Sequence, residues 1–307
     1  MKKVFIDGSA GTTGLRIHER LAERKDLQVI TLSDDLRKDP AARKEALNSS
    51  DIAFLCLPDD AAIESASFVE NPDTVLIDTS TAHRVDPKWA YGFPELKGQR
   101  EKILASKRIA NPGCHASGFV ALVAPLIREG VLKKDTALSC FSLTGYSGGG
   151  KKMIAEYEDA NRDALLDAPR VYGLTQQHKH LKEIVALCEL EKAPAFCPIV
   201  APFYSGMEVS VPVFAEDLNC SKSDLEAFFA SYYQDGLIRF VKDGDENGFL
   251  SAGAFSGRDD LQITITGNEE RILLTARFDN LGKGASGAAI QNMNLILGVP
   301  EDTGLTL

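Results

Sequence analysis

The chain has 307 residues, of which 44% are hydrophobic and 25% charged, with a formal net charge of -10. This composition is typical of a globular protein with room for two domains, and the negative charge argues against a nucleic-acid partner. No apolar run approaches the roughly 20 residues of a membrane span, so no membrane partner is expected. The six cysteines are scattered without a close pair, which favours reduced thiols in a cytoplasmic protein over disulfides or a metal site.

The N-terminal third alternates between strand and helix patterns. Strands are predicted at 3–7, 27–32, 51–57, 74–78 and 108–111, with helices near 12–24 and from Asp59 onward. Such alternation is typical of parallel βαβ units with right-handed crossovers.

The rest of the chain has a different pattern. After a predicted helix near 115–129, extended patterns follow at 136–144, 206–215, 261–266 and 271–278, the last two joined by a hairpin turn at 267–270. They indicate a largely antiparallel sheet in an α+β second domain. A final helix at 285–297 is expected to pack back on the first domain.

The turn between the first strand and the first helix contains a glycine at every third position, since residues 8–14 read Gly-Ser-Ala-Gly-Thr-Thr-Gly. Glycine allows a close approach of backbone to a pyrophosphate, and the helix N-terminus offers unpaired N–H groups to the anion. The turn therefore predicts a dinucleotide site, although a tight structural turn would use the same residues. The predicted contacts are Gly8, Ser9, Gly11, Thr12, Thr13 and Gly14.

The end of the second strand is the place where the adenosine ribose is usually recognised. An acid such as Asp34 or Asp35 there favours NAD, because it accepts from the ribose 2′-hydroxyl. Ser33 and Arg37 would instead suit a 2′-phosphate. The residues themselves leave the choice of cofactor open.

Cys114 follows Asn-Pro-Gly at the start of a predicted helix. The helix dipole stabilises a thiolate at this position, and a cysteine thioester activates an acyl group for hydride attack. We therefore predict that Cys114 is a nucleophile, whereas the other five cysteines are more typical of a protein core.

Two histidines lie two residues apart, His178 and His180, with Glu183 three residues later. An imidazole near Cys114 can act as acid and base near neutral pH. We favour His178 as the base, because Glu183 lies one helical turn after His180 and would draw that ring into a structural pair. Glu183 could also bind a substrate. A surface loop or a metal pair without a third ligand are the other interpretations.

Two further segments suit anions. The glycine-rich run after Ser147, through Gly148 to Lys151, could form a nest of N–H groups with an added positive charge. Arg84 could offer a guanidinium fork to a phosphate, or form a structural ion pair.

Taken together, these motifs resemble the N-acetyl-gamma-glutamyl-phosphate reductases of arginine biosynthesis, in their shorter form. The resemblance covers essentially the whole chain. The matching segments are 8–14, 57–61, 91–95, 111–114, 178–180, 279–285 and 291–294.

The resemblance implies an NADP(H)-dependent enzyme with two domains. The first is a Rossmann dinucleotide-binding domain at 1–113, onto which 285–307 packs; the second is a mixed-sheet catalytic and dimerisation domain at 114–284. Cys114 would form the thioester, and one histidine of the pair would be the acid/base. Pro58, Ser80 and Asn280 join the expected cofactor contacts. The implied partners are a small-molecule acyl phosphate, inorganic phosphate and further copies of the chain, in a homodimer or homotetramer.

Other functions fit parts of the same pattern. The same chemistry could act on aspartyl phosphate or on a carrier-linked aminoadipyl phosphate. A cysteine hydrolase is another possibility, but it would leave the glycine turn without a role. A non-catalytic cofactor sensor would leave the cysteine and the histidines without a role.

Overall fold

The computed structural model describes residues 1–307, which form two compact units. Unit 1 comprises Met1–Pro94, Gly98–Pro112 and Ala285–Leu305. Unit 2 comprises Glu95–Lys97, Gly113–Gly284 and Thr306–Leu307.

Unit 1 contains a six-stranded sheet in the order β2-β1-β3-β4-β6-β5, in which every neighbouring pair is parallel. Its strands are β1 (Lys2–Asp7), β2 (Leu27–Ile30), β3 (Ile52–Leu55), β4 (Val75–Asp78), β5 (Ala90–Tyr91) and β6 (Arg108–Ala110). Its helices are α1 (Thr12–Ala22), α2 (Pro40–Ser49), α3 (Asp59–Ser67), α4 (Gln99–Ala105) and α9 (Gly287–Leu297).

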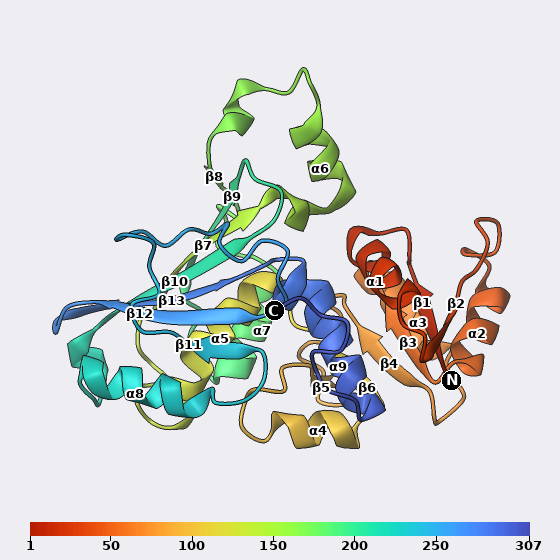
Figure 1. The fold of residues 1–307 in the computed structure, drawn as a ribbon, viewed down its shortest axis with the longest axis horizontal. Helices are drawn as coiled ribbons and strands as arrows, with labels where there is room; N and C mark the ends of the chain where they lie inside the picture. Colours follow the sequence, from red (N-terminus) through yellow and green to blue (C-terminus); the bar gives the residue numbers. More distant parts are fainter. The chain divides into compact units, whose positions relative to one another are not determined.

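Alternation along the strands gives this sheet two buried faces. In β1, Val4 and Ile6 belong to one apolar cluster, which also includes residues of α1 and α9 such as Ile17 and Met293. Phe5 points to the opposite face and packs with residues of α2 and α3. Side chains of a strand alternate between faces, so this pattern requires helices on both sides, the doubly wound architecture visible around β1–β4 in Figure 1.

Unit 2 contains a seven-stranded mixed sheet in the order β11-β12-β13-β10-β7-β9-β8. Its strands are β7 (Ser139–Gly145), β8 (Arg170–Val171), β9 (Ala195–Ala201), β10 (Met207–Phe214), β11 (Ile238–Phe240), β12 (Leu261–Gly267) and β13 (Arg271–Phe278). Its helices are α5 (Cys114–Arg128), α6 (Gly150–Glu158), α7 (His180–Cys188) and α8 (Lys222–Tyr232), with short 3-10 turns and a π-helical turn at Gly282–Ser286.

Helix α5 is the central element of unit 2. Every residue from His115 to Ile127 is buried, and the helix contacts β10, β13 and α7 (Figure 1). A Cβ at Gly118 would lie 2.5 Å from the Val209 side chain, so glycine allows α5 to approach the sheet closely. A helix that is apolar on all sides is stable only when it is surrounded in this way.

The predicted α/β fold, with a Rossmann-type sheet and a second mixed sheet, is confirmed. Each strand and helix that the sequence predicted exists, within a few residues. The sequence patterns did not indicate α2, α4, α7, α8, β5, β8, β9 or β11. None of the helices is both long and apolar enough to span a membrane.

Candidate active site

The glycine turn of unit 1 contains two kinds of glycine. Gly8 has a φ of +88°, and a Cβ there would lie 2.3 Å from the Cys56 carbonyl oxygen. A Cβ at Gly14 would lie 2.4 Å from the Gly8 oxygen. At Gly11 the nearest atom is 3.5 Å away, an ordinary contact. The packing of the protein itself therefore requires Gly8 and Gly14, whereas Gly11 keeps a space open.

That space lies at the N-terminus of α1. Gly11 is the N-cap residue, and no side chain caps the helix. The Thr12 hydroxyl is buried without a hydrogen-bond partner. An uncapped helix start, an orphaned hydroxyl and room for a ligand at Gly11 together fit the pyrophosphate of a dinucleotide. Ser9 and Thr13 lie in the same turn.

The turn after β2 is exposed and contains acidic as well as basic side chains. The Asp35 carboxylate accepts from the Ser33 hydroxyl, which lowers the pKa of Asp35, and Arg37 lies 3.4 Å from Asp34. Ser33 and Arg37, the predicted contacts of a 2′-phosphate, are thus each paired with an acid in the same turn.

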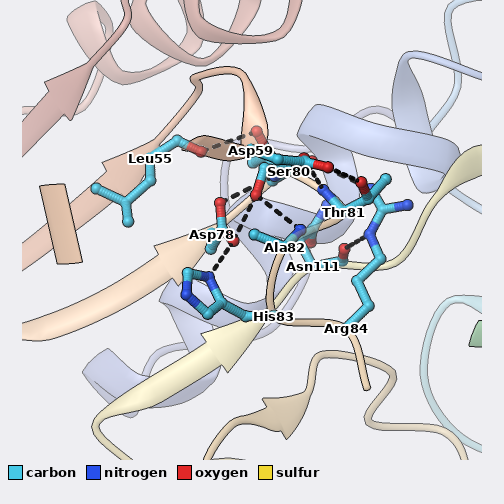
Figure 2. A network of polar contacts seen from close by, with 10 residues as sticks. Leu55, Asp59, Asp78, Ser80, Thr81, Ala82, His83, Arg84 and Asn111 are labelled. Carbon is cyan, nitrogen blue, oxygen red and sulfur yellow. Dashed lines mark hydrogen bonds and ion pairs between the residues drawn. The ribbon is translucent and has the colours of Figure 1, made fainter. Parts of the chain in front are cut away.

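A polar network follows β4 in unit 1 (Figure 2). Asp78 accepts from the backbone N–H and the hydroxyl of Ser80, at 2.9 and 2.7 Å, and contacts Nδ1 of His83 at 2.7 Å. Arg84 donates from Nε to the Asn111 carbonyl and from Nη2 to the Thr79 carbonyl. These bonds fix the loop that contains Ser80 and Arg84 against the end of β6.

Pro58, the remaining predicted cofactor contact of unit 1, occupies the N-cap position of α3 in the short loop that follows β3. It thus lies at the carboxyl end of a parallel strand, the edge at which ligands bind in open α/β sheets.

In unit 2, Cys114 is the first residue of α5 and is half-buried. No side chain caps this helix, so its N-terminal N–H groups and dipole act on the thiol. The Glu183 carboxylate accepts from the Gly113 N–H at 3.2 Å. A Cβ at Gly284 would lie 3.0 Å from that of Cys114, so the chain passes close to the thiol there. Glu183, predicted to touch substrate, is buried and holds the backbone beside Cys114.

Three histidines meet near this helix start. The rings of His178 and His180 lie 4.8 Å apart, and each lies 5.5 Å from the ring of His115. His178 precedes α7 and His180 begins it. The segment is therefore a turn that leads into a helix, and this turn brings the two rings together.

The two predicted histidines differ in environment. Nδ1 of His178 accepts from the His180 backbone N–H at 3.3 Å, and burial, with a smaller effect from Lys179, lowers the pKa of His178 to about 4. Nδ1 of His180 lies 4.0 Å from Oε1 of Glu183, a carboxylate that can pair with the ring once the ring accepts a proton. These contacts favour His180, rather than His178, as the proton acceptor, and the assignment stays a prediction.

Two further residues of this cluster were not predicted from the sequence. His115 contacts the Ser142 hydroxyl through Nδ1 and the Tyr172 hydroxyl through Nε2, both at 2.6 Å. Burial lowers the pKa of His115 to about 3. The adjacency of His115 to Cys114 was the one available signal, and Tyr172 belongs to no motif.

The glycine-rich segment after β7 was expected to bind an anion, but several of its polar groups are paired within the protein. Asn280 donates to the Ser147 hydroxyl at 3.0 Å and accepts from the Gly206 N–H at 2.9 Å. The Ser147 N–H donates to the Tyr204 carbonyl, so it does not face an anion. Gly148 has room for a Cβ, and Lys151 is exposed in the first turn of α6.

No group of three or more His, Cys, Asp or Glu side chains is placed to hold a metal ion.

Comparison with known proteins defines the class. Residues 33–105 match the family model "Semialdehyde dehydrogenase, NAD binding domain", and residues 114–280 match "Semialdehyde dehydrogenase, dimerisation domain". An aspartate semialdehyde dehydrogenase II from Vibrio cholerae, solved in complex with ASA, has a TM-score of 0.70 at 16% identity and covers 97% of this chain and 98% of its own. An aspartate semialdehyde dehydrogenase with NADP from Candida albicans has a TM-score of 0.69 at 16% identity, over 97% of this chain and 99% of its own. At that identity the two structures show the fold alone, and the domain models define a semialdehyde dehydrogenase.

Sequence relatives identify the family within that class. N-acetyl-gamma-glutamyl-phosphate reductase 2 of Nostoc sp. is 43% identical over 99% of both chains. The N-acetyl-gamma-glutamyl-phosphate reductase of Brucella ovis is 46% identical over 96% of this chain and 99% of its own. The chain belongs to the N-acetyl-gamma-glutamyl-phosphate reductase family, as the sequence motifs predicted.

Proposed function

We propose that this protein reduces N-acetyl-gamma-glutamyl phosphate to N-acetylglutamate semialdehyde with NADPH, through a thioester on Cys114. One observation supports it above the others. A chain of this family, similar to its relatives over nearly its full length, has a thiol at a helix start without a side-chain cap, and the next residue, His115, belongs to a cluster of three histidines. A helix start favours thiolate, and an adjacent imidazole can move the protons that thiol chemistry requires.

The first step is acyl transfer. The Cys114 thiolate attacks the γ-carbonyl carbon, the carbon–sulfur bond forms, and the carbon–oxygen bond to phosphate breaks. Phosphate takes the electron pair of that bond. The dipole at the start of α5 would stabilise the negative charge that develops on the carbonyl oxygen.

NADPH, when bound, would supply the hydride that reduces the thioester, and a protonated His180 would give the resulting oxyanion the proton that makes it a thiohemiacetal. We assign its binding to unit 1 as the dinucleotide-binding domain, with the turn Gly8–Gly14 holding the pyrophosphate. Ser33 and Arg37 would recognise the 2′-phosphate, since the guanidinium of Arg37 can exchange Asp34 for a more highly charged phosphate. Pro58 and Ser80 are further proposed contacts, whereas the bonds of Asn280 within unit 2 give it a positioning role.

Collapse of the thiohemiacetal requires removal of its hydroxyl proton and release of the thiolate. We assign the proton to His180, whose charge Glu183 would stabilise. His178, neutral and with Nδ1 occupied, carries its proton on Nε2 and can donate it to a substrate carboxylate or phosphate. Arg84, Gly148 and Lys151 are candidates for contacts with the phosphate.

The assembly we propose is a homodimer in the cytoplasm, or a homotetramer built from such dimers. The dimerisation-domain match covers unit 2. While α5 packs on one face of its sheet, Phe141 on β7 and Phe214 on β10 are 48% and 57% exposed. A sheet face with large exposed aromatic residues is suited to a second copy of the chain.

Steady-state kinetics in the oxidative direction tests the function. With NADP⁺ and inorganic phosphate, N-acetylglutamate semialdehyde and aspartate semialdehyde are compared as substrates, and the better one is repeated with NAD⁺. We expect kcat/KM to favour the N-acetylated substrate and NADP⁺. A preference for aspartate semialdehyde would move the protein to the related reaction, and phosphate-independent turnover would refute acyl-phosphate chemistry.

A further inference from the structure

Three polar side chains of unit 2 are hydrogen-bonded in a row, and the middle one is His115, the residue after Cys114. Ser142 on β7 and His115 on α5 are 0% and 2% exposed, and Tyr172 follows β8. Nδ1 of His115 lies 2.6 Å from the Ser142 oxygen, and Nε2 lies 2.6 Å from the Tyr172 oxygen. The proposed reaction as described above uses none of the three.

The direction of these hydrogen bonds follows from counting donors. His115 is neutral, since burial lowers its pKa to about 3, so it has one N–H and one ring lone pair. The Ser142 hydroxyl has His115 as its one hydrogen-bond partner. If His115 donated to Ser142, the serine proton would be buried without an acceptor, which is unfavourable. Ser142 therefore donates to Nδ1.

This direction determines the Tyr172 proton. With Nδ1 accepting, the His115 proton is on Nε2 and is donated to the Tyr172 oxygen. The hydroxyl proton of Tyr172, a partly exposed residue, is then not used by His115 and can be donated to another group. The Tyr172 backbone is held by its N–H, which donates to the Pro198 carbonyl at 3.0 Å.

Tyr172 contacts the residue that follows the reactive thiol, since its hydroxyl lies 2.6 Å from Nε2 of His115. Burial raises the pKa of the Tyr172 hydroxyl, and the negative charge of Cys114 adds a smaller effect in the same direction. The Tyr172 ring also packs edge-on against His178, with centroids 5.8 Å apart. A phenol that stays protonated next to a group that becomes negative is a hydrogen-bond donor to that group.

We propose that the Tyr172 hydroxyl is an active-site hydrogen-bond donor that stabilises negative charge at Cys114, and that Ser142 and His115 are positioning residues that aim it. The proposal deepens the function proposed above. It extends that site by a residue from the segment between α6 and α7, which no sequence motif indicated.

The test is the pH dependence of Cys114 alkylation by iodoacetamide, followed by mass spectrometry of the Cys114 peptide in the free enzyme. Tyr172→Phe removes one oxygen atom and should raise the midpoint by about one pH unit, so that alkylation at neutral pH slows about tenfold. Ser142→Ala frees His115 to change tautomer and should shift the midpoint in the same direction by less. Ser142→Thr, which restores the hydroxyl, should return it towards the original value.

Tyr233→Phe is the matched control. Its buried hydroxyl donates to the Ala121 carbonyl of the same helix α5, so its loss destabilises the unit without touching the thiol. The control should keep the original midpoint. An unchanged midpoint in Tyr172→Phe would overturn the proposal, as would equal shifts in Tyr172→Phe and Tyr233→Phe.

The alkylation assay needs no substrate, so its result separates the two proposals. Turnover of N-acetylglutamate semialdehyde with an unshifted Tyr172→Phe midpoint would refute the donor role alone. A shifted midpoint in a protein that does not turn over this substrate would refute the proposed function and leave the donor role supported.

Discussion

The buried imidazole of His115 has a consequence for stability that is independent of catalysis. Its pKa is about 3 in the folded chain against an ordinary value of 6.5, so the unfolded chain binds the proton more readily. The stability that this group contributes is present above pH 6.5 and is lost as the pH falls towards 3. At pH 5 the loss amounts to about 2 kcal/mol.

Urea denaturation at pH 7 and pH 5 measures this loss. We expect the free energy of unfolding to fall by about 2 kcal/mol more in the original protein than in His115→Gln, which has no titrating ring. Equal changes in the two proteins would show that His115 is protonated in the folded state.

The histidine pair makes a kinetic prediction. His180→Asn should lower kcat at least about a hundredfold, the lower end of what a lost proton transfer costs. His178→Asn should mainly raise KM, because it loses a donor to the substrate. The kcat and KM values of both variants decide between the two. If His178→Asn instead lowers kcat, the roles are exchanged as the sequence first indicated, and near-normal kinetics in both variants would exclude the pair from the chemistry.

At the scale of elements, the role of the turn between β1 and α1 can be tested at Gly11, the one glycine of the turn at which a side chain would fit. Gly11→Val places a branched side chain where the backbone otherwise has room, so it should block the pyrophosphate. The NADPH dissociation constant should rise more than about tenfold, or 1.4 kcal/mol. Gly253→Val is the control, because its nearest neighbour is also remote, at 3.6 Å. Unchanged NADPH affinity in a folded Gly11→Val protein would mean that the cofactor binds elsewhere.

The elements also show what sequence patterns reveal and what they miss. β1, β3 and β13 are long apolar or alternating runs bounded by turns, and they were predicted. β9 contains Pro198, which disfavours a strand, yet it pairs in parallel with β7 along its full length. β5 and β8 have two residues each and are defined by their neighbours alone. Tertiary pairing supplies what these segments lack locally.

The active site likewise combines residues in local sequence motifs with residues that only the tertiary fold brings together. Cys114 and the glycine turn are local motifs, in which helix start, turn and chemistry lie within a few residues. Tyr172 reaches His115 only because the segment after α6 returns beside β9, a contact between residues 57 positions apart. No periodicity or spacing encodes such a contact, so the sequence could not indicate it.

At the scale of the whole molecule, the proposed dimer uses the open face of the unit 2 sheet. Phe141→Glu places a charge in the proposed interface and should convert the dimer to a monomer, because burying an unpaired charge is strongly unfavourable. Light scattering after size exclusion measures the mass. Leu165→Glu, at a residue that is 71% exposed outside this face, is the matched control and should remain dimeric. A dimeric Phe141→Glu protein would place the interface elsewhere.

The central claim is that Cys114 forms a covalent thioester with the N-acetylglutamyl group. Mixing the protein with N-acetyl-gamma-glutamyl phosphate in the absence of NADPH, followed by rapid acid quench and peptide mass spectrometry, tests it most directly. We expect to find the acyl group on the Cys114 peptide, together with an equimolar burst of phosphate. The Cys114→Ser protein should show neither while still binding NADPH. Turnover by the Cys114→Ser protein, or an acyl group attached to a different residue, would contradict it.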